Sequence, residues 1–148
     1  MKDPHDIILR PHITERSVSE SYGDERGAML RKRNEARRAT LAGGEKSTKK
    51  GDKKSANTAI TVEEGDLARK YTFIVATSAN KIEIKSAIEA IYNAGKKASD
   101  QIQVTSVRTI RIPGKKKRQA RVTGGYTPDR KKAVVTLARG QMLEDYGV

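Results

Sequence analysis

Apolar residues cluster in three segments that have the pattern of β-strands. The clearest covers residues 71–77, where aromatic and β-branched side chains predominate. Runs over residues 104–112 and 133–138 have the same character. These segments predict three strands, and residues 139–148 are expected to add a short fourth strand or to close the edge of the sheet.

A helical pattern lies between the first two of these segments. Ile84, Ala87, Ile88 and Ile91 recur at the spacing that brings side chains to one face of a helix. Asn80 stands at the N-cap position, and a glutamate three residues later would complete a capping box. The apolar stripe is therefore expected to pack on the sheet.

The N-terminal segment predicts a short extended run followed by a short helix. Apolar residues 7–9 lead to Pro11, which favours an extended conformation at the residue before it. Thr14 is a suitable N-cap for a mostly polar helix that continues through Glu20. Glu15 would then lie in the first turn, where the helix dipole favours an acid.

Together these elements predict an α+β fold: a small antiparallel β-sheet of three to four strands, helices packed on one face, and a long basic hairpin loop. We divide the 148 residues into three parts. Residues 1–22 form the N-terminal strand and helix of the core domain, and residues 23–69 form a basic, low-complexity insert. Residues 70–148 form the remainder of the core domain, with the extended hairpin loop over residues 113–130.

The insert differs in composition from the rest of the chain. Residues 23–70 hold thirteen Lys/Arg and eight Asp/Glu with few large apolar side chains. Residues 24–42 favour a helix that ends before a Gly-Gly pair, whereas residues 45–55 are expected to be disordered in the free protein. The insert is either a flexible linker or a second RNA contact. Its candidate RNA-binding residues are Arg31, Lys32, Arg33, Arg37 and Arg38.

Positive charge is concentrated around the predicted hairpin. Residues 108–132 hold ten Lys/Arg and one acid, so +9 of the net charge of +13 lies there. A solvated charge run would explain the composition, but charge at this density repels itself unless a polyanion neutralises it. An anionic membrane is a weaker alternative to nucleic acid, because no basic amphipathic helix with bulky aromatic residues is present.

The hairpin therefore predicts an RNA-binding site. Its candidate residues are Arg108, Arg111, Lys115, Lys116, Lys117, Arg118, Arg121, Tyr126, Arg130, Lys131 and Lys132. Lysine and arginine would contact phosphates, which positions a protein on RNA without specifying a base sequence. Tyr126 would either stack on an unpaired base or plug the base of the hairpin.

No catalytic, metal or cofactor site is predicted. The chain has no cysteine, which excludes disulfides and thiolate sites. Its two histidines, His5 and His12, lack the ordered supporting partners of a metal site, and no phosphate-binding glycine motif is present. The N-terminus has no signal segment, and no apolar run is long enough to span a bilayer, so a cytoplasmic location is expected.

Five short segments carry a further signal in their order and spacing. They are residues 9–16 (LRPHITER), 71–73 (YTF), 80–85 (NKIEIK), 114–118 (GKKKR) and 127–137 (TPDRKKAVVTL). Together they resemble the bacterial large-subunit ribosomal protein L23 family over residues 7–22 and 70–143. The insert replaces what is a tight turn in that family.

The resemblance implies a structural, non-enzymatic constituent of the large ribosomal subunit that binds ribosomal RNA near the polypeptide exit tunnel. It also implies a docking site for the chaperone trigger factor at Ile13, Thr14 and Glu15. The signal recognition particle would use the same neighbourhood, and ribosomal protein L29 would be a neighbour. Two other classes remain open: a free-standing nucleoid or RNA-chaperone protein, and an enzyme acting on nucleic acid, which would require a His/carboxylate cluster.

Overall fold

Four strands form an antiparallel β-sheet in the computed structural model, which describes residues 3–42, 61–117, 124–144 and 146. Their order across the sheet is β1-β2-β4-β3. The strands are β1 (Ile8–Pro11), β2 (Lys70–Val75), β3 (Val104–Ile112) and β4 (Arg130–Leu137). The helices are α1 (Pro4–Ile7), α2 (Glu15–Ser21), α3 (Glu25–Ala42) and α4 (Lys81–Asn93), with 3₁₀ turns at Glu64–Asp66 and Ala98–Asp100. The predicted α+β class with a small antiparallel sheet is confirmed.

The two central strands, β2 and β4, supply most of the core face of the sheet. Tyr71, Phe73 and Val75 alternate along β2 and are all buried, because every second side chain of a strand points to the same face. The matching core residues of β4 are Ala133, Val135 and Leu137. The hydrophobic core therefore lies on this face.

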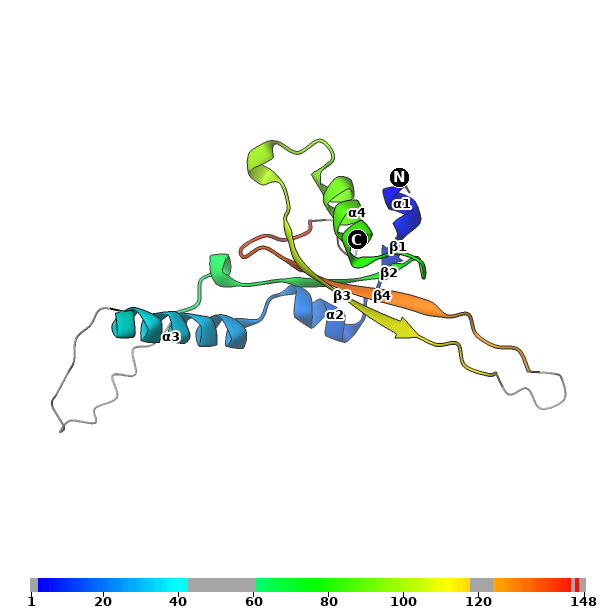
Figure 1. Ribbon diagram of the computed structural model, residues 1–148, viewed down its shortest axis with the longest axis horizontal. Coiled ribbons are helices and arrows are strands. Elements are labelled where there is room, and N and C mark those ends of the chain that lie inside the picture. The colour runs from blue at the N-terminus through cyan, green and yellow to red at the C-terminus, as the bar shows by residue number, and fades with distance from the viewer. Residues whose placement is uncertain (1–2, 43–60, 118–123, 145, 147–148) are drawn as a thin grey trace.

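Helix α4 covers the core face, as Figure 1 shows. Three of the four apolar positions of the predicted stripe are buried, and the fourth is half-buried. The backbone N–H of Asn80 donates to Glu83 Oε2 at 2.8 Å, so the helix begins at the predicted cap. Gly95, with φ of +77°, follows its last turn in the left-handed conformation that commonly ends a helix.

Helix α2 lies on the opposite face of the sheet (Figure 1), whereas the sequence pattern placed the helices on one face. Its predicted N-cap is confirmed: the Ser17 N–H donates to Thr14 Oγ1 at 3.3 Å, and the Thr14 N–H donates to Ser17 Oγ at 2.7 Å. Ser17 is also the buried residue of this helix. A helix that buries a serine has little apolar surface to add to the core, so it packs against the polar face, near Thr72.

The fourth strand comes from the N-terminus, where β1 pairs antiparallel with β2. The described part of the C-terminal tail, residues 139–144 and 146, forms no strand and instead packs on the core. Leu143 is buried, and its N–H donates to the Tyr71 hydroxyl at 3.1 Å. The Tyr146 ring lies edge-on to Tyr71 and Phe73, with centroid distances of 4.8 and 5.6 Å.

The first half of the insert forms α3, as predicted. The Asp24 carboxylate caps it by accepting a hydrogen bond from the Gly27 N–H at 3.0 Å. The prediction for residues 45–55 lies outside the described residues.

Candidate nucleic-acid interface

The β3–β4 hairpin continues well beyond the sheet, and Figure 1 shows its two arms extending away from the body of the molecule. Beyond the named strands, Lys116 and Tyr126 form an antiparallel bridge. The Lys117 N–H donates to the Gly125 carbonyl at 2.8 Å, and the Thr127 N–H donates to the Lys115 carbonyl at 2.9 Å. The described part of the hairpin is thus a paired extension. Arg118 and Arg121 lie outside the described residues.

Gly114 allows the two arms to come together. A Cβ atom at this position would lie 1.8 Å from the Thr127 carbonyl oxygen, a distance that no side chain can occupy. The Gly114 N–H donates to Asp129 Oδ1 at 2.7 Å. The carboxylate of Asp129, the single acid of residues 108–132, is therefore bonded to the backbone of the opposite arm and makes no ion pair with a basic side chain in this contact.

The basic side chains of the hairpin are largely exposed. The exposed candidates are Arg108, Arg111, Lys115, Lys116, Lys117 and Arg130. Tyr126 is also exposed, with 73% of its surface accessible. Its exposure contradicts the alternative that it plugs the base of the hairpin, and stacking on an unpaired base stays a prediction.

Arg108 and Arg111 point to opposite faces of the sheet, because they are three residues apart on one strand. Arg108 shares the polar face with Ser106 and Ile110. Since β3 is an edge strand, Arg111 is exposed near the other face beside the start of the hairpin arms. The two arginines therefore cannot contact the same phosphate.

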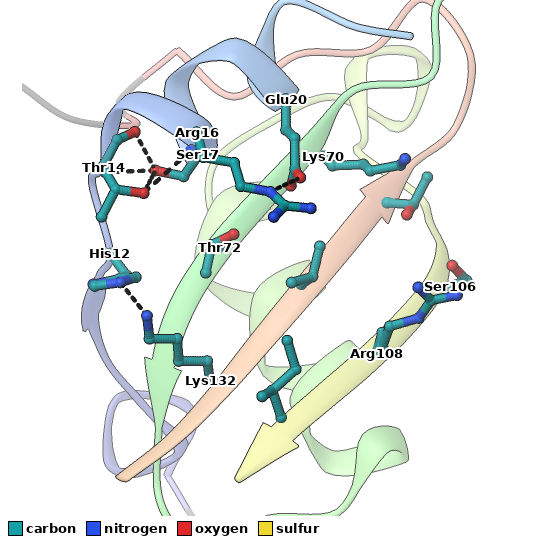
Figure 2. A pocket seen from close by; sticks show the side chains of 13 residues that line it. His12, Thr14, Arg16, Ser17, Glu20, Lys70, Thr72, Ser106, Arg108 and Lys132 are labelled. Atoms are coloured by element: carbon teal, nitrogen blue, oxygen red, sulfur yellow. Dashed lines mark hydrogen bonds and ion pairs between the residues drawn. The ribbon is translucent and has the colours of Figure 1, made fainter. Parts of the chain in front are cut away.

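Figure 2 shows a groove between α2 and the polar face of the sheet. It encloses about 590 Å³. Its cationic lining residues are Arg16, Lys70, Arg108 and Lys132. The acid of the lining, Glu20, accepts a hydrogen bond from Arg16 Nε at 3.1 Å, and Ile110 and Val134 contribute apolar surface to it. The groove thus offers both positive charge and an apolar surface to a ligand.

His12 lies at one end of this groove, where Lys132 Nζ donates a hydrogen bond to its Nε2 (Figure 2). Burial lowers the pKa of His12, and the charges of Lys132, Arg10 and Arg130 lower it further. The imidazole is consequently neutral at pH 7 and acts as an acceptor for the lysine. It therefore adds no positive charge to the groove.

Lys131 and Lys132 both make hydrogen bonds within the protein. Lys131 Nζ donates to the Ala79 carbonyl at 2.7 Å and to the Thr77 carbonyl at 3.2 Å. These bonds join β4 to the loop before α4. The sequence pattern does not distinguish these two lysines from their exposed neighbours.

Sequence reasoning missed Arg16 and Lys70 as part of this surface. Each is far along the chain from the basic hairpin, so no local charge density marks it. One signal was present for Lys70: it alternates with the core residues Tyr71 and Phe73, which places it and Thr72 on the opposite face.

The family model for ribosomal protein L23 matches residues 44–144, more than half of the chain. The chain belongs to the ribosomal protein L23 family. The resemblance found in the sequence is thereby confirmed. An L23 protein is a component of the large ribosomal subunit and not an enzyme, so the chain acts on the ribosome, in translation.

Curated L23 relatives support the assignment. The large ribosomal subunit protein uL23 of Desulfitobacterium hafniense (strain DSM 10664 / DCB-2) is 47% identical over 77 residues, which cover 52% of this chain and 72% of that protein. The uL23 of Heliobacterium modesticaldum is 44% identical over 87 residues, or 57% of this chain and 82% of that protein. The uL23 of Pelotomaculum thermopropionicum is 32% identical over 144 residues, 97% of this chain and 95% of that protein. That last alignment reaches across the insert, so a segment there is shared with at least one L23 relative.

Membership of the L23 family sets aside the free-standing nucleoid protein and the enzyme as alternatives. Across the described ranges, none of the helices combines the length and apolar character needed to cross a bilayer. The family assignment also gives the basic surfaces a defined setting, because the large subunit is built around ribosomal RNA.

Proposed function

We propose that this L23-family chain binds ribosomal RNA beside the polypeptide exit tunnel and that its long hairpin makes the main contact. The observation that carries the proposal is the paired extension of β3 and β4, which holds exposed lysines on hydrogen-bonded arms, with the carboxylate of Asp129 bonded to the backbone of the opposite arm. The proposed RNA-contacting residues are Arg108, Arg111, Lys115, Lys116, Lys117, Arg118, Arg121, Tyr126 and Arg130, and Lys131 and Lys132 support them from β4. Ordered cations bind phosphates at a smaller entropic cost than cations on a flexible chain.

The groove on the polar face extends the same interface. Lys70 and Arg108 line it from two different strands, where they can contact successive phosphates. Ile110 and Val134 give an unpaired base an apolar surface to lie on. Lys131 and Lys132 keep their protein contacts and contribute mainly by holding β4 in place.

Directed cleavage of ribosomal RNA tests where the hairpin lies. Because the chain has no cysteine, Lys116→Cys gives a single attachment point for an iron chelate that generates hydroxyl radicals. In assembled large subunits we expect cleavage of the RNA that lines the exit tunnel. Ile82→Cys is the matched control, since Ile82 is 81% exposed and lies on α4, outside the hairpin. Cleavage from position 82 without any from position 116 would overturn the proposal for the hairpin.

The proposed function includes a docking site for trigger factor at Ile13, Thr14 and Glu15. Ile13 is half exposed, and Glu15 is exposed in the first turn of α2. An apolar side chain beside an exposed carboxylate is a suitable small anchor for a partner. The signal recognition particle would use the same neighbourhood, and ribosomal protein L29 would be a neighbour in the subunit.

Replacing Glu15 with alanine is expected to weaken trigger factor binding to ribosomes roughly 10- to 100-fold, the effect of losing one charged hydrogen bond of about 1.5–3 kcal/mol. Co-sedimentation of trigger factor with variant ribosomes measures this. Glu25→Ala is the matched control, because Glu25 occupies the equivalent first-turn position of α3. Equal binding by the two variants would show that Glu15 is not the anchor.

A further inference from the structure

One face of α3 is fixed to residues 61–67, which form the last part of the insert. Lys32 Nζ pairs with Asp66 Oδ2 at 2.5 Å and donates to the Thr61 carbonyl at 2.9 Å. Arg31 Nη2 donates to the Asp66 carbonyl at 3.4 Å, and Ala28 is buried on the same face. The hydrogen bond from Lys32 holds the pKa of Asp66 below its ordinary value. The basic residues Arg31 and Lys32 therefore serve the attachment of the helix.

Further contacts fix α3 relative to the sheet. Gly23 packs so closely on Leu67 that a Cβ would lie 2.9 Å from the leucine Cβ. The Gly140 N–H donates to the Leu67 carbonyl at 3.1 Å, which ties this segment to the turn after β4. Arg139 of the same turn lies 3.7 Å from Glu35 of α3. The helix is thus an attached part of the fold.

The opposite face of α3 carries a basic stripe. Arg26, Arg33 and Arg37 recur at intervals of seven and four residues, so they line up along one side of the helix. Met29 and Leu30 lie among them and are 46% and 50% exposed. The two acids of α3 lie off this stripe, since Glu35 is on the attached face and Glu25 is a quarter-turn aside.

We propose that this outward stripe binds the phosphate backbone of ribosomal RNA as a second anchor, an inference that rests on the proposed function of the chain. Guanidinium groups match phosphate oxygens in geometry as well as charge. A helix attached by its other face presents these groups in a fixed line about 16 Å long. The stripe includes Arg33 and Arg37 of the sequence-based candidates and adds Arg26.

A second anchor on α3 would fix the orientation of the protein on RNA, because α3 and the hairpin lie far apart. Figure 1 shows them at opposite ends of the long axis of the molecule. Two RNA contacts at opposite ends fix orientation, and the second forms at a high effective concentration once the first is made. The uL23 relative that aligns over 97% of this chain also covers α3.

The triple variant R26Q/R33Q/R37Q tests the anchor in the full-length chain with large-subunit ribosomal RNA. The slope of log affinity against log salt is expected to become shallower by about 2, because three phosphate contacts are lost and each releases roughly 0.7 counterions. The control K81Q/K96Q/K97Q removes equal charge at the start of α4 and in the loop after it, and is expected to leave the slope unchanged. An arginine-to-lysine triple variant should retain most of the slope. Circular dichroism checks that α3 remains folded.

A photocrosslinking side chain in place of Leu30 identifies the partner in assembled subunits. An adduct with ribosomal RNA is expected. An adduct with a neighbouring protein alone, or an unchanged salt slope in the triple variant, would overturn the inference. Parallel titration of a hairpin variant with the same RNA separates the two proposals. If only the α3 variant loses RNA affinity, the hairpin contact is refuted. If only the hairpin variant loses RNA affinity, the stripe is refuted.

Discussion

Replacing Phe73 with alanine is expected to destabilise the protein by about 3–5 kcal/mol, the cost typical of deleting a fully buried aromatic ring. Phe73 is 1% exposed on the central strand β2. Its ring lies 5.6 Å from that of Tyr146 and 6.3 Å from that of Tyr92, so the deletion opens a cavity between the sheet, α4 and the C-terminal tail. Such a loss is a large share of the 5–15 kcal/mol that stabilises an ordinary domain.

Urea denaturation followed by circular dichroism measures this effect. Ile82→Ala is the control, because Ile82 is 81% exposed and its truncation is expected to change the free energy of unfolding by less than about 0.5 kcal/mol. A loss below about 1 kcal/mol for Phe73→Ala would mean that the tail and α4 close over the cavity. Strand β4 pairs with β2 and is also one arm of the hairpin, so unfolding of the sheet disrupts the hairpin. The unfolded fraction of this variant is therefore also expected to lose RNA binding.

The parts of the fold that the sequence predicts are those governed by local periodicity. The alternation around Phe73, the apolar stripe of α4 and its cap at Asn80 all depend on neighbours within four residues, which the sequence shows directly. The start of β4 was predicted three residues too late, at Ala133 instead of Arg130. Residues 130–132 are all basic and do not have the apolar pattern of a strand. Their strand conformation depends on the partner strand, where Arg130 pairs with Ile112.

Long-range features could not be predicted in the same way. The polar groove depends on the register that brings Lys132 beside Ile74 and Thr72 beside Val134. It also depends on α2 packing on the face that α4 leaves open, a choice between two faces that a helix pattern alone does not make. The resemblance to the L23 family predicted that the chain belongs to the ribosome. The charge pattern alone predicted only that it binds a polyanion.

The division of the basic residues into structural and exposed groups is the most useful result of the structure. Lys131 and Lys132 bond within the protein, and Arg31 and Lys32 attach α3. Composition treats all of these as equal candidates for RNA. Only the contacts separate the side chains that build the surface from those that remain exposed on it.

Neutralising the exposed basic residues of the hairpin is expected to cause a large loss of RNA affinity. In the variant K115Q/K116Q/K117Q/R130Q, four exposed cations of the hairpin are neutralised, while Lys131 and Lys132 keep their internal bonds. At roughly 0.7 counterions per contact, the slope of log affinity against log salt should become shallower by about 3, and affinity near 0.1 M salt should fall about 10²–10³-fold. Filter binding to large-subunit ribosomal RNA across a salt series measures both quantities.

The control for this variant is K81Q/K85Q/K96Q/K97Q, which removes the same charge along α4 and the loop that follows it. If counterion release depended only on net charge, the two variants would lose affinity equally, and the hairpin would have no special role. A loss specific to the hairpin variant requires that phosphates lie along the paired arms. The bridge between Lys116 and Tyr126 explains why the contact would be strong there, since the arms are already ordered before RNA binds.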